Sequence, residues 1–210
     1  MLKGGLVLVD PANASVLRVI VLQYNPETLT RTLQAQSVGT DSGPHVDQMR
    51  LKGPPVETIK LDAEIDATDA LADPDNNATA VSSGIAPQLA ALEMIIYPTS
   101  QQLAAADANA RAGTLEIAPM DAPLVLFVWS QSRVVPVRIT EFSITEDMFD
   151  SALNPIRAKV SLGFRVLSID DLPYASSGGS IFLAYQQQKE RLAQQAAGGT
   201  LAKLGITGIQ

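Results

Sequence analysis

The 210-residue sequence contains no cysteine, and it has a single histidine and a single tryptophan. Without cysteine the chain has no disulfide, no cysteine-based zinc site and no thiol nucleophile. The one histidine, His45, does not build a multi-histidine zinc site, and no G-x-S-x-G motif offers it a serine nucleophile. The sequence therefore predicts a protein without cofactor, metal ion or catalytic activity.

Long apolar runs and an excess of basic charge are also missing. Only a five-residue apolar run precedes Asp10, which is too short for the core of a signal peptide. The longest apolar run, 123–130, has the length of a strand. The net charge is −7, whereas a nucleic-acid-binding protein usually shows a basic face. We therefore expect neither a nucleic acid nor a membrane as partner, and a protein that is cytoplasmic on synthesis.

Strand-like patterns dominate both halves of the chain, of which 46% is apolar. The clearest alternation of apolar and polar residues runs from 56 to 69. The only long helical pattern before the carboxy-terminal region covers about 85–112, and Pro98 interrupts it. This order predicts a mainly β fold: an antiparallel two-sheet sandwich or barrel with one helical insert and a carboxy-terminal helix.

The composition changes near residue 172, where we place a domain boundary. Residues 1–172 are expected to form the β domain, which includes the insert at about 85–112. Residues 173–210 are expected to form a linker, with the small residues 176–180, followed by a glutamine-rich helical tail.

One face of the strand at 56–69 carries Asp62, Glu64 and Asp66. Side chains on one face of a strand lie roughly 6–7 Å apart, which is compatible with the paired carboxylates of a glycosidase or with a metal site. The other interpretation is a solvated sheet face, since Lys60 on the same face partly neutralises the carboxylates. We favour the solvated face.

Basic residues alternate with apolar ones along the strand that follows Asn154-Pro155. Arg157, Lys159 and Arg165 share one face, and the apolar residues between them share the face that packs into a core. The basic face is either solvated or pairs with acidic faces on a neighbouring subunit. Because the sequence offers no set of catalytic residues, we give more weight to pairing with a neighbouring subunit. The candidate subunit-interface residues are therefore Arg157, Lys159, Arg165, Asp62, Glu64 and Asp66.

With these residues in view, the chain resembles the amino-terminal domain of contractile injection system tube proteins, the tube initiators of phage-tail-like particles. The stretches 22–32, 85–98 and 138–167 carry the resemblance, which extends over roughly residues 1–172. Members of this family often carry a LysM module after the tube domain. This sequence continues instead with the linker and helix, so no cell-wall-binding role is carried over.

The resemblance implies a β-barrel or two-sheet tube domain that assembles around an axis through its sheet edges. It implies a hexameric ring that joins the baseplate hub and spike proteins to the inner-tube protein. This ring would initiate tube assembly and would be incorporated into a phage-tail-like particle that can be released. Residues 181–196 would dock on a baseplate neighbour. The alternative is a carbohydrate-active or ligand-binding β-sandwich that uses Asp62, Glu64 or Asp66.

Overall fold

The structure is a computed structural model that describes residues 2–37, 50–113 and 122–208; His45 lies outside these ranges. Seven strands form one antiparallel sheet in the order β2-β1-β5-β6-β7-β4-β3. The strands are β1 (Gly5–Val9), β2 (Val16–Val21), β3 (Leu29–Gln34), β4 (Val56–Asp66), β5 (Leu124–Ser130), β6 (Arg133–Phe149) and β7 (Pro155–Val166).

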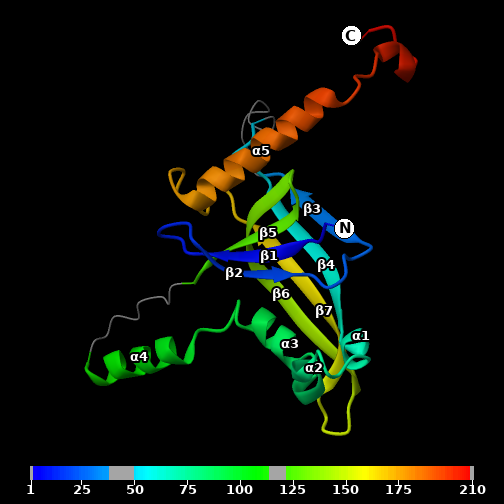
Figure 1. Ribbon diagram of the computed structural model, residues 1–210. Helices are drawn as coiled ribbons and strands as arrows, with labels where there is room; N and C mark the ends of the chain where they lie inside the picture. The colour runs from blue at the N-terminus through cyan, green and yellow to red at the C-terminus, as the bar shows by residue number, and fades with distance from the viewer. Residues whose placement is uncertain (1, 38–49, 114–121, 209–210) are drawn as a thin grey trace.

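The expected mainly β, antiparallel fold with inserted helices and a carboxy-terminal helix is confirmed. The strands form one continuous sheet, not two separate ones, and the sheet is not closed. The 17-residue strand β6 joins its two halves, because its first part pairs with β5 and its remainder pairs with β7. In Figure 1, β1 and β2 cross in front of β6 and β7, so the single sheet folds into two layers.

The hydrophobic core lies between these two layers. Phe127 on β5 stacks on Phe164 on β7 with ring centroids 5.3 Å apart, and both side chains are almost fully buried. The alternation predicted for β4 appears as buried Ile59, Leu61 and Ile65 on the core face. Burial of each such side chain contributes about 1.5–3 kcal/mol, so these contacts hold the two layers together.

The described part of the connection from β4 to β5 contains four helices: α1 (Thr68–Leu71), α2 (Ala78–Ser83), α3 (Ala86–Glu93) and α4 (Ser100–Arg111). They begin before the expected residue 85: α1 starts at Thr68, directly after a local turn in which the Asp66 carboxylate accepts a hydrogen bond from the Thr68 N–H. Helix α3 buries Leu89 and Leu92 in the core. Helix α4 starts at a capping box of Thr99 and Gln102, and none of its residues is buried.

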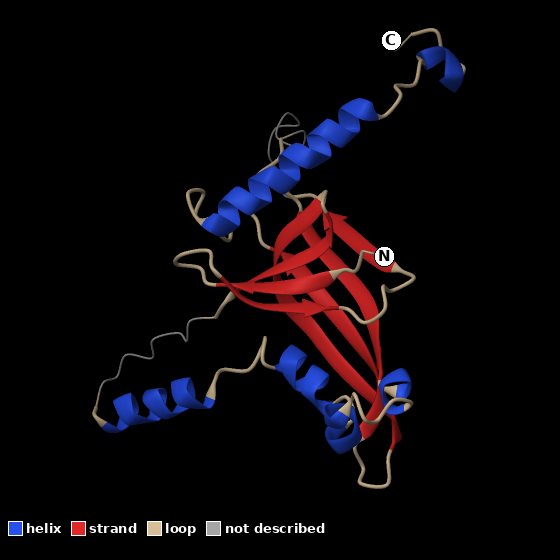
Figure 2. Cartoon of the chain, viewed as in Figure 1, coloured by secondary structure: helices blue, strands red, loops and turns tan. Residues whose placement is uncertain are grey.

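Helix α5 (Ser177–Gln195) crosses the end of the sheet opposite α1 and α2, and a short 3₁₀ helix, η2 (Leu201–Leu204), follows it (Figure 2). The segment 176–180, interpreted from the sequence as linker, caps this helix and forms its first turn, since the Gly179 N–H donates to the Ser176 hydroxyl. Phe182 and Tyr185 reach the main core. The remainder of α5 extends beyond the sheet, and the domain boundary near residue 172 stays a prediction.

Candidate functional site

The acidic and basic candidate residues lie side by side on the outer face of two neighbouring strands. β4 and β7 pair antiparallel in a register that puts Glu64 opposite Lys159 and Asp66 opposite Arg157. Asp62 lies opposite Ser161. The structure therefore brings all the candidate residues except Arg165 into one patch, which we call the β4–β7 charged face.

Ion pairs within the chain connect the members of this face. Lys159 Nζ lies 2.7 Å from Asp62 Oδ2, and Arg157 Nε lies 2.9 Å from Asp66 Oδ2 and 3.7 Å from Glu64 Oε1. Most of these side chains are between 40% and 61% exposed, and only Asp66, at 13%, is well covered. Exposed pairs contribute about 0–1 kcal/mol each, so they can exchange partners at little cost.

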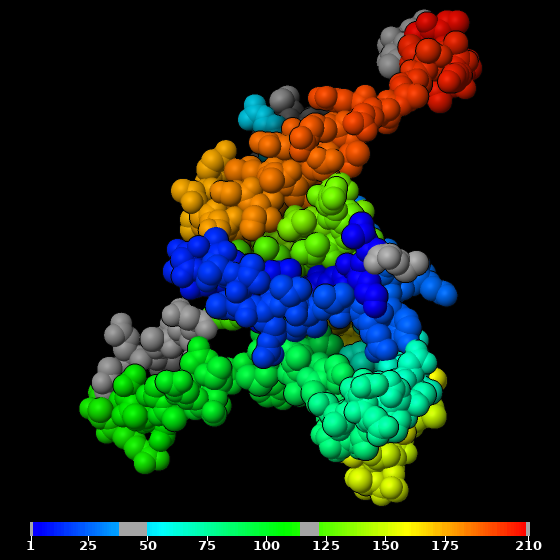
Figure 3. All heavy atoms as spheres, in the orientation of Figure 1, coloured from blue at the N-terminus to red at the C-terminus, as the bar shows by residue number. Residues whose placement is uncertain are grey.

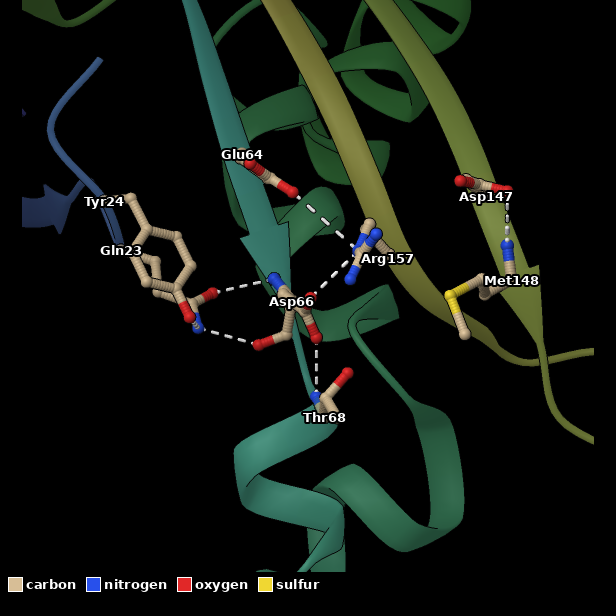
Figure 4. A network of polar contacts seen from close by, with 8 residues as sticks. All are labelled: Gln23, Tyr24, Glu64, Asp66, Thr68, Asp147, Met148 and Arg157. Carbon is tan, nitrogen blue, oxygen red and sulfur yellow. Dashed lines mark hydrogen bonds and ion pairs between the residues drawn. The ribbon is translucent and has the colours of Figure 1, made fainter. Parts of the chain in front are cut away.

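Asp66 has hydrogen-bond partners on three other segments of the chain (Figure 4). Its backbone N–H donates to the Gln23 side-chain oxygen at 2.9 Å, and its carbonyl accepts from the Gln23 amide nitrogen at 2.7 Å. Its carboxylate accepts from the Thr68 N–H and from Arg157. Asp66 thus fixes the end of β4 to the chain that follows β2 and to the start of α1.

The electrostatics of the face keep its aspartates ionised. Hydrogen bonds from Lys159 and then from the Ser161 hydroxyl lower the pKa of Asp62. Hydrogen bonds from Thr68, and to a lesser extent from Arg157, lower the pKa of Asp66. A glycosidase needs one carboxyl group with a raised pKa as its general acid, and neither aspartate meets this requirement.

An open groove of about 780 Å³ runs beside the charged face. Tyr24 and Thr28 line one side, and Glu64, Arg157 and Lys159 line the other. The groove is open to solvent, and charged side chains of the β4–β7 charged face form part of its lining.

Arg165 lies at the opposite end of β7 from the charged face. Its guanidinium contacts the Asp171 carboxylate at 2.9 Å. Directly opposite it on β6 is a second arginine, Arg138. The Arg165 Nε is buried and has no hydrogen-bond partner among the residues that the structure describes.

A buried carboxylate that the sequence reasoning missed joins α5 to the sheet. Glu57 is 3% exposed and accepts hydrogen bonds from Arg31 Nε at 2.8 Å, Tyr185 Oη at 3.0 Å and Lys189 Nζ at 3.1 Å. Burial opposes its ionisation, but Arg31 and Lys189 together lower the pKa of Glu57. The signal in the sequence was a charged residue at a core-facing position of the β4 alternation.

Within residues 2–37, 50–113 and 122–208 no group of three or more His, Asp or Glu side chains is placed to hold a metal ion. None of the described helices combines the length and the apolar character that crossing a membrane requires.

A comparison with models of known protein families identifies the family of this chain. The sequence model of the family described as contractile injection system tube protein matches residues 9–172, which is well over half of the chain. The match includes β2 to β7 and the inserted helices, and it ends before α5. No curated protein matches the chain.

Proposed function

Because the chain belongs to the family of contractile injection system tube proteins, we propose that it forms the ring that joins the baseplate hub to the inner tube. The ring acts as the initiator on which the first inner-tube subunits assemble. Its role is structural, and it performs no catalytic step.

The observation that carries this proposal, beyond the family itself, is the open sheet with two free edges. β2 and β3 are the terminal strands, so among the residues that the structure describes no strand lies beside one backbone edge of each. On β2, Val16, Leu17, Val19 and Val21 are all more than half exposed. An apolar edge strand favours pairing with another chain, and a closed ring of copies covers every such edge. We expect a hexamer.

The β4–β7 charged face supplies the polar part of the same assembly. Its ion pairs are mostly exposed and individually weak, so neighbouring copies can replace them with pairs between subunits. Asp62, Glu64, Arg157 and Lys159 would then determine the orientation of the contact more than its strength.

The remaining partners follow from the position of such a ring. The inner-tube protein binds on one side of the ring, and the hub and spike proteins bind on the other. The exposed part of α5 and the tail after it, with Leu192, Leu201 and Leu204 exposed, face a baseplate neighbour. The protein is made in the cytoplasm and is incorporated into the particle.

The test is to purify the carboxy-terminally tagged protein from its own host and to image the material by negative-stain electron microscopy. We expect tubular or sheathed particles that carry the tag at one end. A small species without tail-like partners would contradict the proposed role and leave the family membership as a statement about the fold. Loss of tubes on deletion of the gene is the matching genetic result.

A further inference from the structure

The hairpin between β6 and β7 ends in an exposed apolar tip. Phe149 is 49% exposed, Met148 is 50% exposed and Leu153 is 79% exposed. In Figure 3 this hairpin, in yellow, protrudes beyond the helices α1 and α2 at the end of the molecule far from α5. Large apolar side chains gathered at a protruding turn are typical of a contact site.

The tip is held in one conformation. Met148 and Leu153 have positive φ angles, 57° and 65°, which residues other than glycine rarely adopt. The Asp150 carboxylate stabilises the turn by accepting hydrogen bonds from the N–H groups of Ala152 and Asn154, both at 2.8 Å, and from the Asn154 side-chain amide. Backbone strain maintained by such a network is common at binding sites.

The base of the hairpin is equally fixed. The Pro155 carbonyl accepts a hydrogen bond from the Ile85 N–H at 2.9 Å, at the start of α3. A Cβ atom at Gly84 would collide with the same carbonyl oxygen, so only glycine allows this close approach. The tip is therefore preorganised, and docking it loses little conformational entropy.

A complementary surface lies on the same chain, where β5 diverges from β6. It is a groove of about 530 Å³, which we call the β5–β6 groove. Its apolar lining includes Ile95, Ile96, Leu124, Val137, Ile139 and Leu167. Ile96 is 48% exposed, so a partner can reach this part of the lining, whereas Ile95, Leu124 and Val137 are at most 9% exposed.

The charges of the two surfaces are opposite. Glu146, Asp147 and Asp150 surround the tip, whereas Arg138 lines the groove. Arg165 lies directly across from Arg138 but does not line the groove, and its guanidinium pairs with Asp171. A carboxylate arriving at the groove would therefore meet the Arg138 guanidinium and form a charge-assisted hydrogen bond with it.

The tip cannot reach the groove of its own chain. Arg138 and Phe149 are eleven positions apart on β6, which at about 3.3 Å per residue is roughly 36 Å of strand. The continuous ladder between β6 and β7 keeps these two points apart. A hairpin tip that occupies the groove therefore has to come from another molecule.

We propose that the hairpin tip, residues 146–153, docks into the β5–β6 groove of a second copy of this chain. Tip and groove are different surfaces, so the contact is heterologous and closes into a ring or continues as a stack. This inference rests on the proposed function, because both require several copies of the chain to assemble. It adds that the hairpin tip of one copy meets the β5–β6 groove of another.

The absence of cysteine from the sequence allows a direct test. Leu153→Cys and Ile96→Cys variants, with different tags, are co-expressed in the host, and the purified material is oxidised. A disulfide forms only between Cβ atoms about 3.5–4.5 Å apart. We expect a mixed dimer on a non-reducing gel, and its loss when Phe149→Glu is added to the Leu153→Cys chain.

The control pairs Ile96→Cys with Leu192→Cys, a residue of α5 that is also 48% exposed. Electron microscopy of the same samples separates the two proposals. Particles that lack the mixed dimer, or that give no more of it than the control pair, would overturn the docking and leave the ring function standing. The mixed dimer without any tube or ring would support the docking and contradict the function. A disulfide between two Leu153→Cys chains in place of the mixed dimer would indicate contact between tips and overturn the docking.

Discussion

The side-chain amide of Gln23 hydrogen-bonds to both backbone groups of Asp66 and so takes the place of a missing strand between β2 and β4. The amide nitrogen lies 2.7 Å from the Asp66 carbonyl, and the amide oxygen lies 2.9 Å from the Asp66 nitrogen. The sheet is not closed by strand pairing at this point, yet one side chain connects the two layers.

Replacing Gln23 by leucine should destabilise the fold. Gln23→Leu leaves the partly buried N–H and carbonyl of Asp66 without their partner, and we expect the free energy of unfolding to fall by about 2 kcal/mol. Urea denaturation followed by circular dichroism measures it. Gln186→Leu, at an exposed position of α5, is the matched control, and equal midpoints for the two variants would contradict this role.

Neutralising Glu57 should weaken the attachment of α5. Glu57→Gln removes the buried charge that Arg31 and Lys189 share, and hydrogen bonds to charged groups contribute about 1.5–3 kcal/mol. We expect the free energy of unfolding to fall by about 2 kcal/mol. The loss is not larger because Arg31 and Lys189 are partly exposed and keep access to water. The measurement is the urea midpoint, together with faster amide hydrogen exchange in α5. Unchanged exchange in α5 would show that the helix is held by its apolar contacts alone.

The stability of the protein should fall in acid. The folded pKa of Glu57 lies below its usual 4.5, so its contribution is fully present above that value and is lost as the pH falls through the lower folded pKa. Asp62 and Asp66, lowered from 3.8, act with the same sign. Thermal unfolding between pH 7 and pH 3 should show this decline, and Glu57→Gln should show less of it. An equal decline in both proteins would argue against the role of Glu57.

The phenol of Tyr185 should lose its proton only at high pH. Burial, and then the nearby Glu57 carboxylate, raise the pKa of Tyr185 to about 12. A raised folded pKa stabilises the fold below the unfolded value of about 10 and loses that effect as the pH rises toward 12. Ultraviolet titration of the phenolate absorbance should show one late-titrating tyrosine among the four in the sequence, absent from Tyr185→Phe. Titration of all tyrosines together near pH 10 would contradict the burial.

A charge swap should separate folding from assembly on the β4–β7 charged face. Asp62→Lys combined with Lys159→Asp keeps an ion pair within the chain but reverses both charges toward a neighbour. We expect a melting temperature close to that of the wild type, since exposed pairs contribute about 0–1 kcal/mol, and loss of incorporation into particles.

The simpler variant, Arg157→Glu with Lys159→Glu, should also fail to incorporate. It leaves Asp62, Glu64 and Asp66 without their cations, so some loss of stability is expected as well. Normal incorporation of the charge-swapped chain would overturn the interface role of these residues, whatever the simpler variant does.

Local periodicity determined much of this fold. The alternation in β4 predicted which residues are buried, because a strand turns successive side chains to opposite faces wherever it lies. The same alternation predicted which face of β4 carries the acidic residues and which face of β7 carries the basic ones. The family resemblance rested on short local motifs. The helix starts were less accurate, since the turn at Asp66 and the cap at Ser176 depend on a few local hydrogen bonds.

What the sequence by itself determined is therefore the class of the protein: a mainly β chain without cysteine, with charged strand faces and the motifs of its family. Only the tertiary structure decided which distant residues meet. Glu57 and Tyr185 are 128 positions apart, and Gln23 and Asp66 are 43 apart. Periodicity reports which face of an element is buried but not what is packed against it, because the partner is selected by the folding of the whole sheet.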